Sequence, residues 1–238
     1  MFGLKSKKKK AKLAKTGRRL VTIYDSKSIF AEQFRTIRTN IKYTVLDADL
    51  KTIVVTSSIP GEGKSTNTAN LGVVFAQEGK KVLIVDADMR KPTTHYTFGL
   101  RNTIGLSTVL SKQSGLLSAI QETPIVGLHI LSSGPSPPNP TELLSSQSFD
   151  VFLTELKSCF DIILFDAPPL LSVSDAQVLS HKCDGALLVI HAGVVEKAAV
   201  SKAKAILSAS QANILGVVLN QYKMPKQHQF YYDHYGED

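Results

Sequence analysis

The chain has 238 residues, 43% of them hydrophobic, and a formal net charge of +8. This length suits a single α/β domain with a sizeable core, and no apolar run approaches the roughly 18 residues that would span a bilayer. The N-terminus has no apolar stretch of the kind found in a secretory signal. The two cysteines, Cys159 and Cys183, have neither metal-ligand spacing nor a disulfide framework, so we expect both to be buried and reduced in a cytoplasmic protein.

The positive charge is concentrated in an N-terminal arm. Residues 1–19 contain nine Lys or Arg and no acid, which leaves 19 basic and 20 acidic residues, a net charge of −1, in the remainder. The remainder lacks the basic face that nucleic-acid binding requires, so we expect no nucleic-acid partner. We predict that residues 1–20 form a disordered basic arm. The arm is either simply solvated or attracted to an anionic membrane surface, and equal binding of full-length and 1–19-deleted protein to anionic liposomes at low salt would exclude the second alternative.

Residues 28–44 predict an amphipathic helix with Ser28 available as its cap. Apolar residues recur at helical spacing at Ile29, Phe34, Ile37 and Ile41. Glu32, Arg35 and Arg38 lie near one edge of this helix. Glu32 and Arg35 could simply form an exposed local pair with no role in an interface. Arg38 has no partner within the helix, which suggests an acidic partner across an interface.

Residues 52–66, TIVVTSSIPGEGKST, predict a phosphate-binding loop between a strand and a helix. The apolar run at 53–55 is typical of a buried strand, and the pattern at 67–77 is helical. Glycines let backbone N–H groups converge on phosphate oxygens, and the helix N-terminus adds partial positive charge. Lys64 can reach the β- and γ-phosphates of ATP, and the Ser65 hydroxyl can bind Mg²⁺. The nucleotide-binding residues expected in this loop are Gly61, Glu62, Gly63, Lys64, Ser65 and Thr66.

Two further strands are predicted to end in acidic residues. Asp86 and Asp88 follow the apolar run at 81–85 and start on one side of that strand, at the end where doubly wound sheets bind ligands. Two unpaired acids there would be costly, so Mg²⁺ bound to phosphates is the natural explanation. Asp166 ends a second apolar run, at 161–165, and is typical of the other Mg²⁺-side carboxylate of P-loop enzymes. The side chains expected around the metal and the phosphates are Ser65, Asp86, Asp88, Arg90 and Asp166.

The remaining elements complete a doubly wound, mostly parallel sheet with helices on both faces, the P-loop NTPase fold. Strands that alternate with helices indicate such a parallel sheet. The folded domain is expected to span 21–221. Its other predicted segments are short helices within 104–120, a strand at 129–131, a rigid loop at 133–140, a helix capped near Thr141, strands at 185–190 and 214–219, and a helix over about 195–210.

The last residues of the chain, 222–238, hold four of its seven tyrosines. Their neighbours are mostly Lys, Gln, His, Asp and Gly without apolar periodicity, so we predict a flexible tail with exposed phenol groups. Adhesive or stacking roles are alternatives, but the lack of a basic context fits RNA binding poorly. The tail is therefore predicted to be a phosphorylation substrate, with the acceptors Tyr222, Tyr231, Tyr232 and Tyr235.

From about residue 22 to its end, the chain resembles the bacterial tyrosine kinases of capsule and exopolysaccharide synthesis, in the separate cytoplasmic-subunit form found in Gram-positive bacteria. The resemblance rests on the Walker A loop SSIPGEGKST, the Walker A′ strand VLIVDADMR and the Walker B strand IILFDAPP. The EQFRTIRTN helix, the SGPSPPNPTELL segment and the tyrosine cluster add to it. It implies an ATP-dependent protein-tyrosine kinase that phosphorylates its own tail in trans and regulates polysaccharide synthesis and export.

The resemblance also implies the roles of the site residues. Lys64 would hold the phosphates and Ser65 the Mg²⁺, while the three acids Asp86, Asp88 and Asp166 would arrange the metal and its waters. Either Asp86 or Asp88 would accept the phenol proton, because a tyrosine with a pKa near 10 is protonated at neutral pH. Positioning and electrostatic neutralisation would supply most of the catalysis.

Several partners follow from the same resemblance. The edge formed by Glu32, Arg35 and Arg38 matches the family's oligomerisation motif, in which subunits form a closed ring, here expected to be an octamer, and each tail enters a neighbour's site. A transmembrane polysaccharide co-polymerase or adaptor would activate the kinase and hold it at the inner face of the plasma membrane. A tyrosine phosphatase would reverse the modification. The basic arm lies outside the shared pattern.

Two alternatives stay open at this point. A ParA/MinD-type ATPase has the same ancestral fold, but its loop carries an early lysine where this chain has Ile59, and it lacks a terminal tyrosine cluster. Ser58 also departs from the usual G-x-x-x-x-G-K-[ST] pattern, since it occupies the first glycine position. The second alternative is a non-catalytic, nucleotide-dependent regulatory subunit of a polysaccharide assembly machine, for which the same ATP-site residues would serve.

Overall fold

In the computed structural model, residues 20–44 and 50–223 are described, and their strands form one seven-stranded sheet. The order across the sheet is β3-β4-β2-β5-β1-β6-β7. All neighbouring strands run parallel except β3 and β4, which are antiparallel. The strands are β1 (Thr52–Ser57), β2 (Val82–Asp86), β3 (Ile120–Glu122), β4 (Leu128–Leu131), β5 (Ile162–Asp166), β6 (Gly185–His191) and β7 (Ile214–Asn220).

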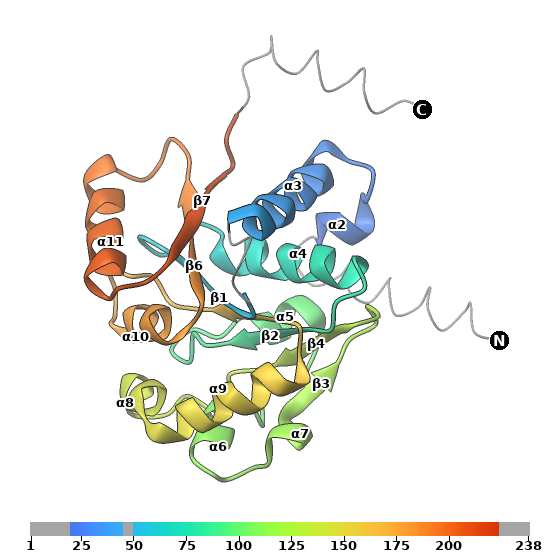
Figure 1. Ribbon diagram of the computed structural model, residues 1–238, viewed down its shortest axis with the longest axis vertical. Coiled ribbons are helices and arrows are strands. Elements are labelled where there is room, and N and C mark those ends of the chain that lie inside the picture. Colours follow the sequence, from blue (N-terminus) through green and yellow to red (C-terminus); the bar gives the residue numbers. More distant parts are fainter. Residues whose placement is uncertain (1–19, 45–49, 224–238) are drawn as a thin grey trace, which may run out of the picture.

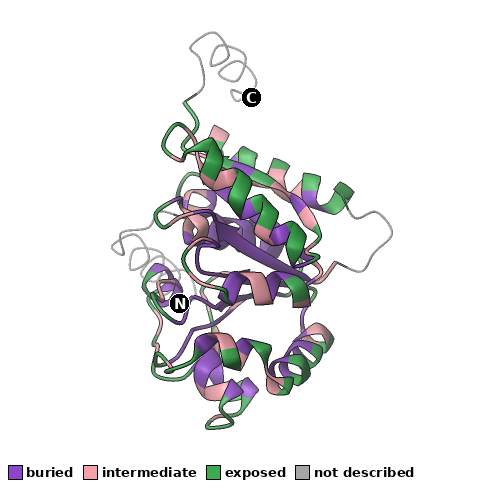
Figure 2. Ribbon diagram, turned by 90° about the vertical axis from the view of Figure 1, so that its left-hand side faces the viewer, coloured by how far each residue is buried: buried purple, intermediate pink, exposed green. Residues whose placement is uncertain are grey.

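Helices cover both faces of this sheet (Figure 1). One face carries α2 (Val21–Tyr24), α3 (Ile29–Thr44), α4 (Lys64–Gln77) and α5 (Thr94–Phe98). The other carries α6 (Leu106–Leu110), α7 (Leu116–Ala119), α8 (Pro140–Ser145), α9 (Gln147–Cys159), α10 (Asp175–Lys182) and α11 (Lys197–Ala209). A sheet covered on both faces needs strands that are apolar throughout, and Figure 2 shows buried strands between helices whose outer faces are exposed. The predicted doubly wound, mostly parallel sheet with helices on both faces is thus confirmed.

The register of the central strands determines where the acidic residues meet. Asp86 on β2 pairs with Asp166 on β5, and Val55 on β1 pairs with the same Asp166 from the other side. The carboxyl ends of three adjacent strands therefore lie together, at the edge where open α/β sheets bind ligands. The loop that follows β1 begins at this point.

Sequence patterns missed several of the smaller elements. The antiparallel edge strand β3 is only three residues long, too short for a periodicity to be recognised. Helices α9 and α10 were not predicted. The helix expected to be capped near Thr141 begins at Pro140 instead, because proline lacks the N–H that a first helical residue leaves unbonded, and its φ suits that position. The short helices within 104–120, the strand at 129–131 and the helix near 195–210 are confirmed as α6, α7, β4 and α11.

The N-terminal helix forms as predicted, with one change at its boundary. The Ser28 hydroxyl accepts the N–H of Ala31 at 3.2 Å, which is the expected cap. Ile41 is buried, while Phe34 and Ile37 pack against the same core cluster. Leu20, which was assigned to the arm, is only 1% exposed in this cluster. The packed part of the chain therefore begins one residue earlier than predicted.

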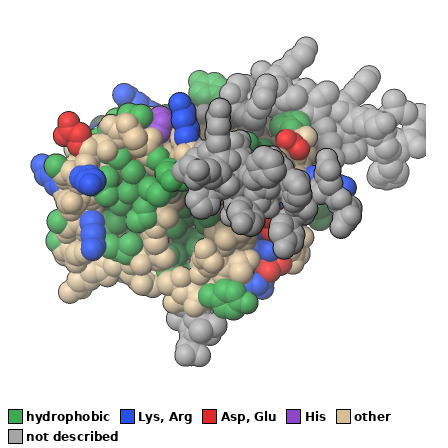
Figure 3. Space-filling model, turned by 90° about the horizontal axis from the view of Figure 1, so that it is seen from above, with side chains coloured by type: hydrophobic (Ala, Val, Ile, Leu, Met, Phe, Trp, Pro, Cys, Tyr) green, Lys and Arg blue, Asp and Glu red, His purple; other side chains and the backbone are tan. Residues whose placement is uncertain are grey.

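Both cysteines are free; Cys183 is buried as expected, whereas Cys159 is only half-buried. No helix among the described residues is both long and apolar enough to cross a membrane. Hydrophobic side chains nevertheless gather on the face seen in Figure 3. On the edge strand β7, the side chains of Val217 and Leu219 are exposed.

Candidate active site

The loop between β1 and α4 has the backbone of a phosphate cradle. Gly61 and Gly63 adopt φ values of 87° and 92°, a left-handed region in which a side chain would be strained. Gly63 is also the N-cap of the 14-residue helix α4, and the first N–H groups of this helix are directed into the loop. Ser58 is not among the residues with positive φ, so the missing first glycine is conformationally harmless.

Glu62 supports this loop from behind. Its buried carboxylate accepts the N–H of Ile59 at 2.8 Å and the N–H of His191 at 3.0 Å. The Asn220 side chain donates to the Glu62 carbonyl at 2.8 Å. The sequence had assigned Glu62 to nucleotide binding, but its side chain faces β6 and does not line the cavity described below. It ties the loop to the ends of β6 and β7.

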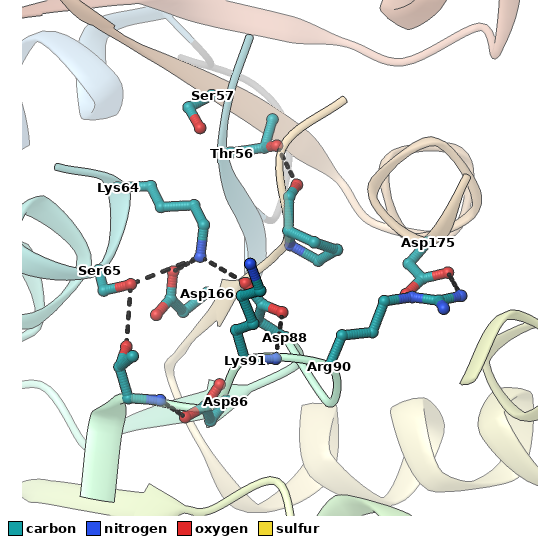
Figure 4. A network of polar contacts seen from close by, with 12 residues as sticks. Thr56, Ser57, Lys64, Ser65, Asp86, Asp88, Arg90, Lys91, Asp166 and Asp175 are labelled. Carbon is teal, nitrogen blue, oxygen red and sulfur yellow. Dashed lines mark hydrogen bonds and ion pairs between the residues drawn. The ribbon is translucent and has the colours of Figure 1, made fainter. Parts of the chain in front are cut away.

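Lys64 lies between two of the strand-end carboxylates (Figure 4). Its Nζ is 2.9 Å from Asp88 Oδ2 and 3.4 Å from Asp166 Oδ1. Burial by itself would lower the pKa of Lys64, but the negative charges of Asp166 and Asp88 outweigh it and leave that pKa raised. The ammonium group is therefore charged and directed at the centre of the site.

Asp86 is completely buried, as is Asp166, whereas Asp88 is 5% exposed. Asp86 Oδ2 accepts the N–H groups of Thr93 and Thr94, each at 2.9 Å, whereas the buried Oδ1 of Asp86 has no partner in the described part of the chain. Burial, reinforced by the nearby charge of Asp166, raises the pKa of Asp86 to about 7. An orphaned carboxylate oxygen in such a position is costly, and a bound cation would remove that cost.

The donor set around Asp86 fits Mg²⁺. The Ser65 hydroxyl is linked to Thr93 Oγ1 at 3.2 Å, and Thr93 in turn holds Asp86, so Ser65 and Asp86 belong to one cluster. No group of three or more His, Cys, Asp or Glu side chains in the described ranges forms a metal cage. Mg²⁺ does not require one, because it is usually bound by one or two carboxylates, substrate phosphates and waters.

Arg90 turns away from the position that the sequence suggested. Its Nε and Nη2 lie 2.9 Å and 3.2 Å from the two carboxylate oxygens of Asp175, which is fully buried at the start of α10. Thr141 of α8 donates to the same carboxylate at 2.5 Å. Arg90 still borders the cavity, but this bidentate pair holds its guanidinium against α10 (Figure 4). Sequence reasoning missed Asp175, because it lies in a helix that was not predicted.

Lys64, Asp88 and Arg90 border a cavity of about 510 Å³, within the usual range for a small-molecule site. The Thr56 hydroxyl donates to the Pro168 carbonyl at 2.7 Å, which fastens the loop after β5 beside the phosphate loop. Sequence reasoning did not single out Lys91 or the Pro168–Pro169 wall. The residues that line the cavity are Pro60, Gly61, Gly63, Lys64, Ser65, Thr66, Asp88, Arg90, Lys91, Thr93, Pro168, Pro169, Ser172, Val173 and Gln221.

The charged side chains on the edge of α3 that was predicted to mediate oligomerisation have partners within the same chain. Glu32 and Arg35 form the expected local pair at 2.7 Å. Arg38 Nη1 donates to the Val74 carbonyl of α4 at 2.8 Å, so its lack of a partner within α3 does not require one from another subunit. The contact of Arg38 with another subunit therefore stays a prediction, and the Val74 carbonyl could not have been foreseen because a backbone carbonyl leaves no trace in the sequence.

The predicted acceptor tyrosines lie at the end of the described chain or beyond it. Tyr222 is 56% exposed just after β7, and Gln221 before it borders the cavity. Tyr231, Tyr232 and Tyr235 lie outside the described residues, as does the basic arm of residues 1–19.

Comparison with known proteins places this site in context. The AAA domain family matches residues 50–214. The tyrosine-protein kinase YwqD of Bacillus subtilis (strain 168) is 46% identical over 215 residues, which cover 90% of this chain and 91% of the relative. The putative tyrosine-protein kinase CapB of Staphylococcus aureus is 42% identical over 212 residues, which cover 89% and 92%.

Solved structures support the same grouping. The chimerical protein CapA2B2 matches with a TM-score of 0.83 and 43% identity, over 87% of this chain and 90% of that one. The cell division ATPase MinD of Pyrococcus furiosus matches with a TM-score of 0.63 and 28% identity, over 74% and 76%. The MinD-type fold is therefore shared, but the similarity to the kinase group is greater and covers more of both chains.

Proposed function

This chain belongs to the bacterial tyrosine-protein kinases of capsule synthesis, and from that premise we propose that it transfers the γ-phosphoryl group of ATP to tyrosines of its own C-terminal tail, acting in trans between subunits. The observation that carries the proposal is the position of Lys64. Its ammonium group lies at the N-terminus of α4, between Asp88 and Asp166, and borders a cavity of nucleotide size. Such a cation attracts the phosphates of ATP.

The chain's own residues support a metal site on one side of Lys64. Ser65 and Asp86 would hold Mg²⁺, with Asp166 beside Asp86 in the sheet. When bound, Mg²⁺ neutralises the negative charge that the β- and γ-phosphates present. The backbone N–H groups of Thr93 and Thr94 fix the orientation of Asp86, so its free Oδ1 is preorganised for that cation.

The proton acceptor is best assigned to Asp88. It borders the cavity, whereas Asp86 is completely buried behind it. When Lys64 turns to the phosphates, Asp88 Oδ2 loses its ion-pair partner and becomes available as a base. The tyrosine oxygen forms a bond to the γ-phosphorus as the bond to the β–γ bridging oxygen breaks. The phenol proton passes to Asp88, and ADP leaves with the bonding electron pair.

Phosphotyrosine mapping tests this function. We expect full-length protein incubated with Mg-ATP and a candidate adaptor's cytoplasmic tail to carry phosphate on Tyr231, Tyr232 or Tyr235. A variant with all four tail tyrosines changed to phenylalanine is the control and should stay unmodified. ATP hydrolysis without phosphotyrosine under these activating conditions would instead support an ATPase or a regulatory subunit.

We also propose that Glu32 and Arg35 contribute to a ring-shaped homo-oligomer, expected to be an octamer. Arg35 remains on the surface, and its Nη2 also donates to the Ser26 carbonyl at 2.6 Å. Changing Glu32, Arg35 and Arg38 to alanine should shift the assembly towards monomer in light scattering. Since Arg38 also holds α3 on α4, the Glu32→Ala/Arg35→Ala double variant is the cleaner test. A Gln33→Ala/Asn40→Ala control on the exposed side of α3 should keep the wild-type mass, and an unchanged mass in the double variant would count against the interface.

The cellular setting belongs to the same proposal. A transmembrane adaptor would activate the kinase at the inner face of the plasma membrane, and a tyrosine phosphatase would reset the tail. The basic arm of residues 1–19 would add attraction to anionic lipid. Membership of the kinase family is the reason to expect the adaptor and the phosphatase, whereas only the charge of the arm supports the lipid contact.

A further inference from the structure

Two adjacent cations, Arg90 and Lys91, follow the acidic end of β2, and their side chains run in different directions. The side chain of Arg90 runs to Asp175, while that of Lys91 points away from Asp175, past Asp88 (Figure 4). Asp88 Oδ1 accepts the backbone N–H of Lys91 at 3.0 Å, so the base of the Lys91 side chain is anchored to a site carboxylate. The pair Arg90–Asp175 therefore fixes the loop, and Lys91 is the cation that the loop presents.

The Lys91 ammonium group has no protein partner within the described part of the chain. Lys91 is exposed, it borders the cavity, and only its backbone makes a hydrogen bond there. The neighbouring Lys64, by contrast, is already shared between two carboxylates. A lysine with a long flexible stem and three free donors suits a ligand oxygen at the cavity mouth.

The charge balance of the site calls for such a second cation. Within residues 20–44 and 50–223, the three carboxylates of Asp86, Asp88 and Asp166 have one lysine, Lys64, placed among them. A triphosphate adds more negative charge, and the metal site on the side of Ser65 compensates only the part next to Asp86. In phosphoryl transfer, charge spreads over the three equatorial oxygens of the transferred group, and cations around that group lower the barrier. Lys91 lies on the side of Asp88, where the acceptor tyrosine would enter.

We propose that Lys91 is a further catalytic residue, whose ammonium group binds the transferred γ-phosphoryl group. The proposal rests on the kinase function above and assigns to Lys91 the phosphate contact that the sequence had suggested for Arg90. Because only a triphosphate places an anion there, Lys91 distinguishes ATP from ADP, whereas the phosphate loop binds both. A contact that strengthens as charge shifts in the transition state acts mainly on kcat.

Nucleotide binding and kinetics of full-length Lys91→Met test this role. We expect its Kd for Mg-ADP to change less than about two-fold, while its Kd for a non-hydrolysable Mg-ATP analogue rises about ten-fold, as for loss of one hydrogen bond to a charged group. The kcat for tail phosphorylation should fall about 100-fold, with little change in the KM for acceptor peptide 222–238. Lys91→Arg should recover a large part of kcat. Lys202→Met, an exposed lysine on α11, is the matched control and should behave as wild type.

Each other outcome overturns the proposal. Equal weakening of ADP and the ATP analogue would place Lys91 on the α- or β-phosphate. A rise in the KM for the acceptor peptide alone would assign Lys91 to an acidic residue of the tail, such as Asp233. Unchanged binding and kinetics would leave it a solvated lysine. The binding comparison needs no phosphotyrosine, so failure of the kinase proposal in wild type is distinguishable from failure of this inference.

Discussion

Replacing Lys64 by methionine should abolish tail phosphorylation, with kcat reduced by at least about 10³-fold. The variant keeps the aliphatic stem and removes the ammonium group that contacts both Asp88 and Asp166. Phosphates entering the site would then meet Asp88 and Asp166 without the ammonium group that lies between them. Phosphotyrosine detection after incubation with Mg-ATP and the adaptor tail measures the effect.

The same substitution should change the pH dependence of stability. Lys64 holds the pKa of Asp86 below the value that burial and Asp166 alone would produce, so its removal raises that pKa further. A carboxyl whose pKa is raised by folding destabilises the protein as pH rises through the range between its unfolded and folded values. Urea unfolding of Lys64→Met should therefore show a larger loss of stability between pH 6 and pH 8 than wild type, with Lys202→Met as control. A wild-type pH profile together with retained phosphotyrosine would contradict the assigned role of Lys64.

The sheet and the centre of the site were predictable because their signals are local. Each central strand is buried on both faces, so its sequence is an unbroken apolar run, and Asp86 and Asp166 stand where those runs end. The parallel arrangement then brings both carboxylates to one edge, as their pairing in the register shows. Gly61 and Gly63 mark the loop because only glycine suits their positive φ.

The parts that could not be predicted depend on contacts between distant segments. Arg90 reaches Asp175, 85 residues away, and Arg38 reaches the Val74 carbonyl, 36 residues away. The donors that fix Asp86 are backbone N–H groups, which any residue would supply. Glu62 was placed on the nucleotide because of its neighbours in the loop, yet its carboxylate binds backbone N–H groups behind it. Side-chain identity carries no information about such partners.

A substitution of Asp86 should affect activity and stability in opposite directions. Its pKa is raised from the usual value near 4 to about 7 by burial and by Asp166. Folding therefore favours the protonated carboxyl, and the stability of the metal-free protein should fall as pH rises from about 4 to about 7, by up to about 4 kcal/mol, and then level off. Asp86→Asn removes this ionisation, so the variant should lose tail phosphorylation yet unfold at a higher urea concentration than wild type at pH 8.

Magnesium should reverse the order of stability between wild type and Asp86→Asn. Occupation of the Asp86–Ser65 side by Mg²⁺ stabilises only a protein that binds it, so adding Mg-ADP at pH 8 should raise the unfolding midpoint of wild type and raise that of Asp86→Asn much less. Asp25→Asn, at an exposed position far along the chain, should respond like wild type. If wild-type stability did not fall between pH 5 and pH 8, the pKa of Asp86 would not be raised by folding. If Mg-ADP stabilised both proteins equally, Asp86 would not be a metal ligand. The buried, half-paired carboxylate of Asp86 would thus lower the stability of the metal-free protein and, in return, offer Mg²⁺ a ligand oxygen whose orientation is already fixed.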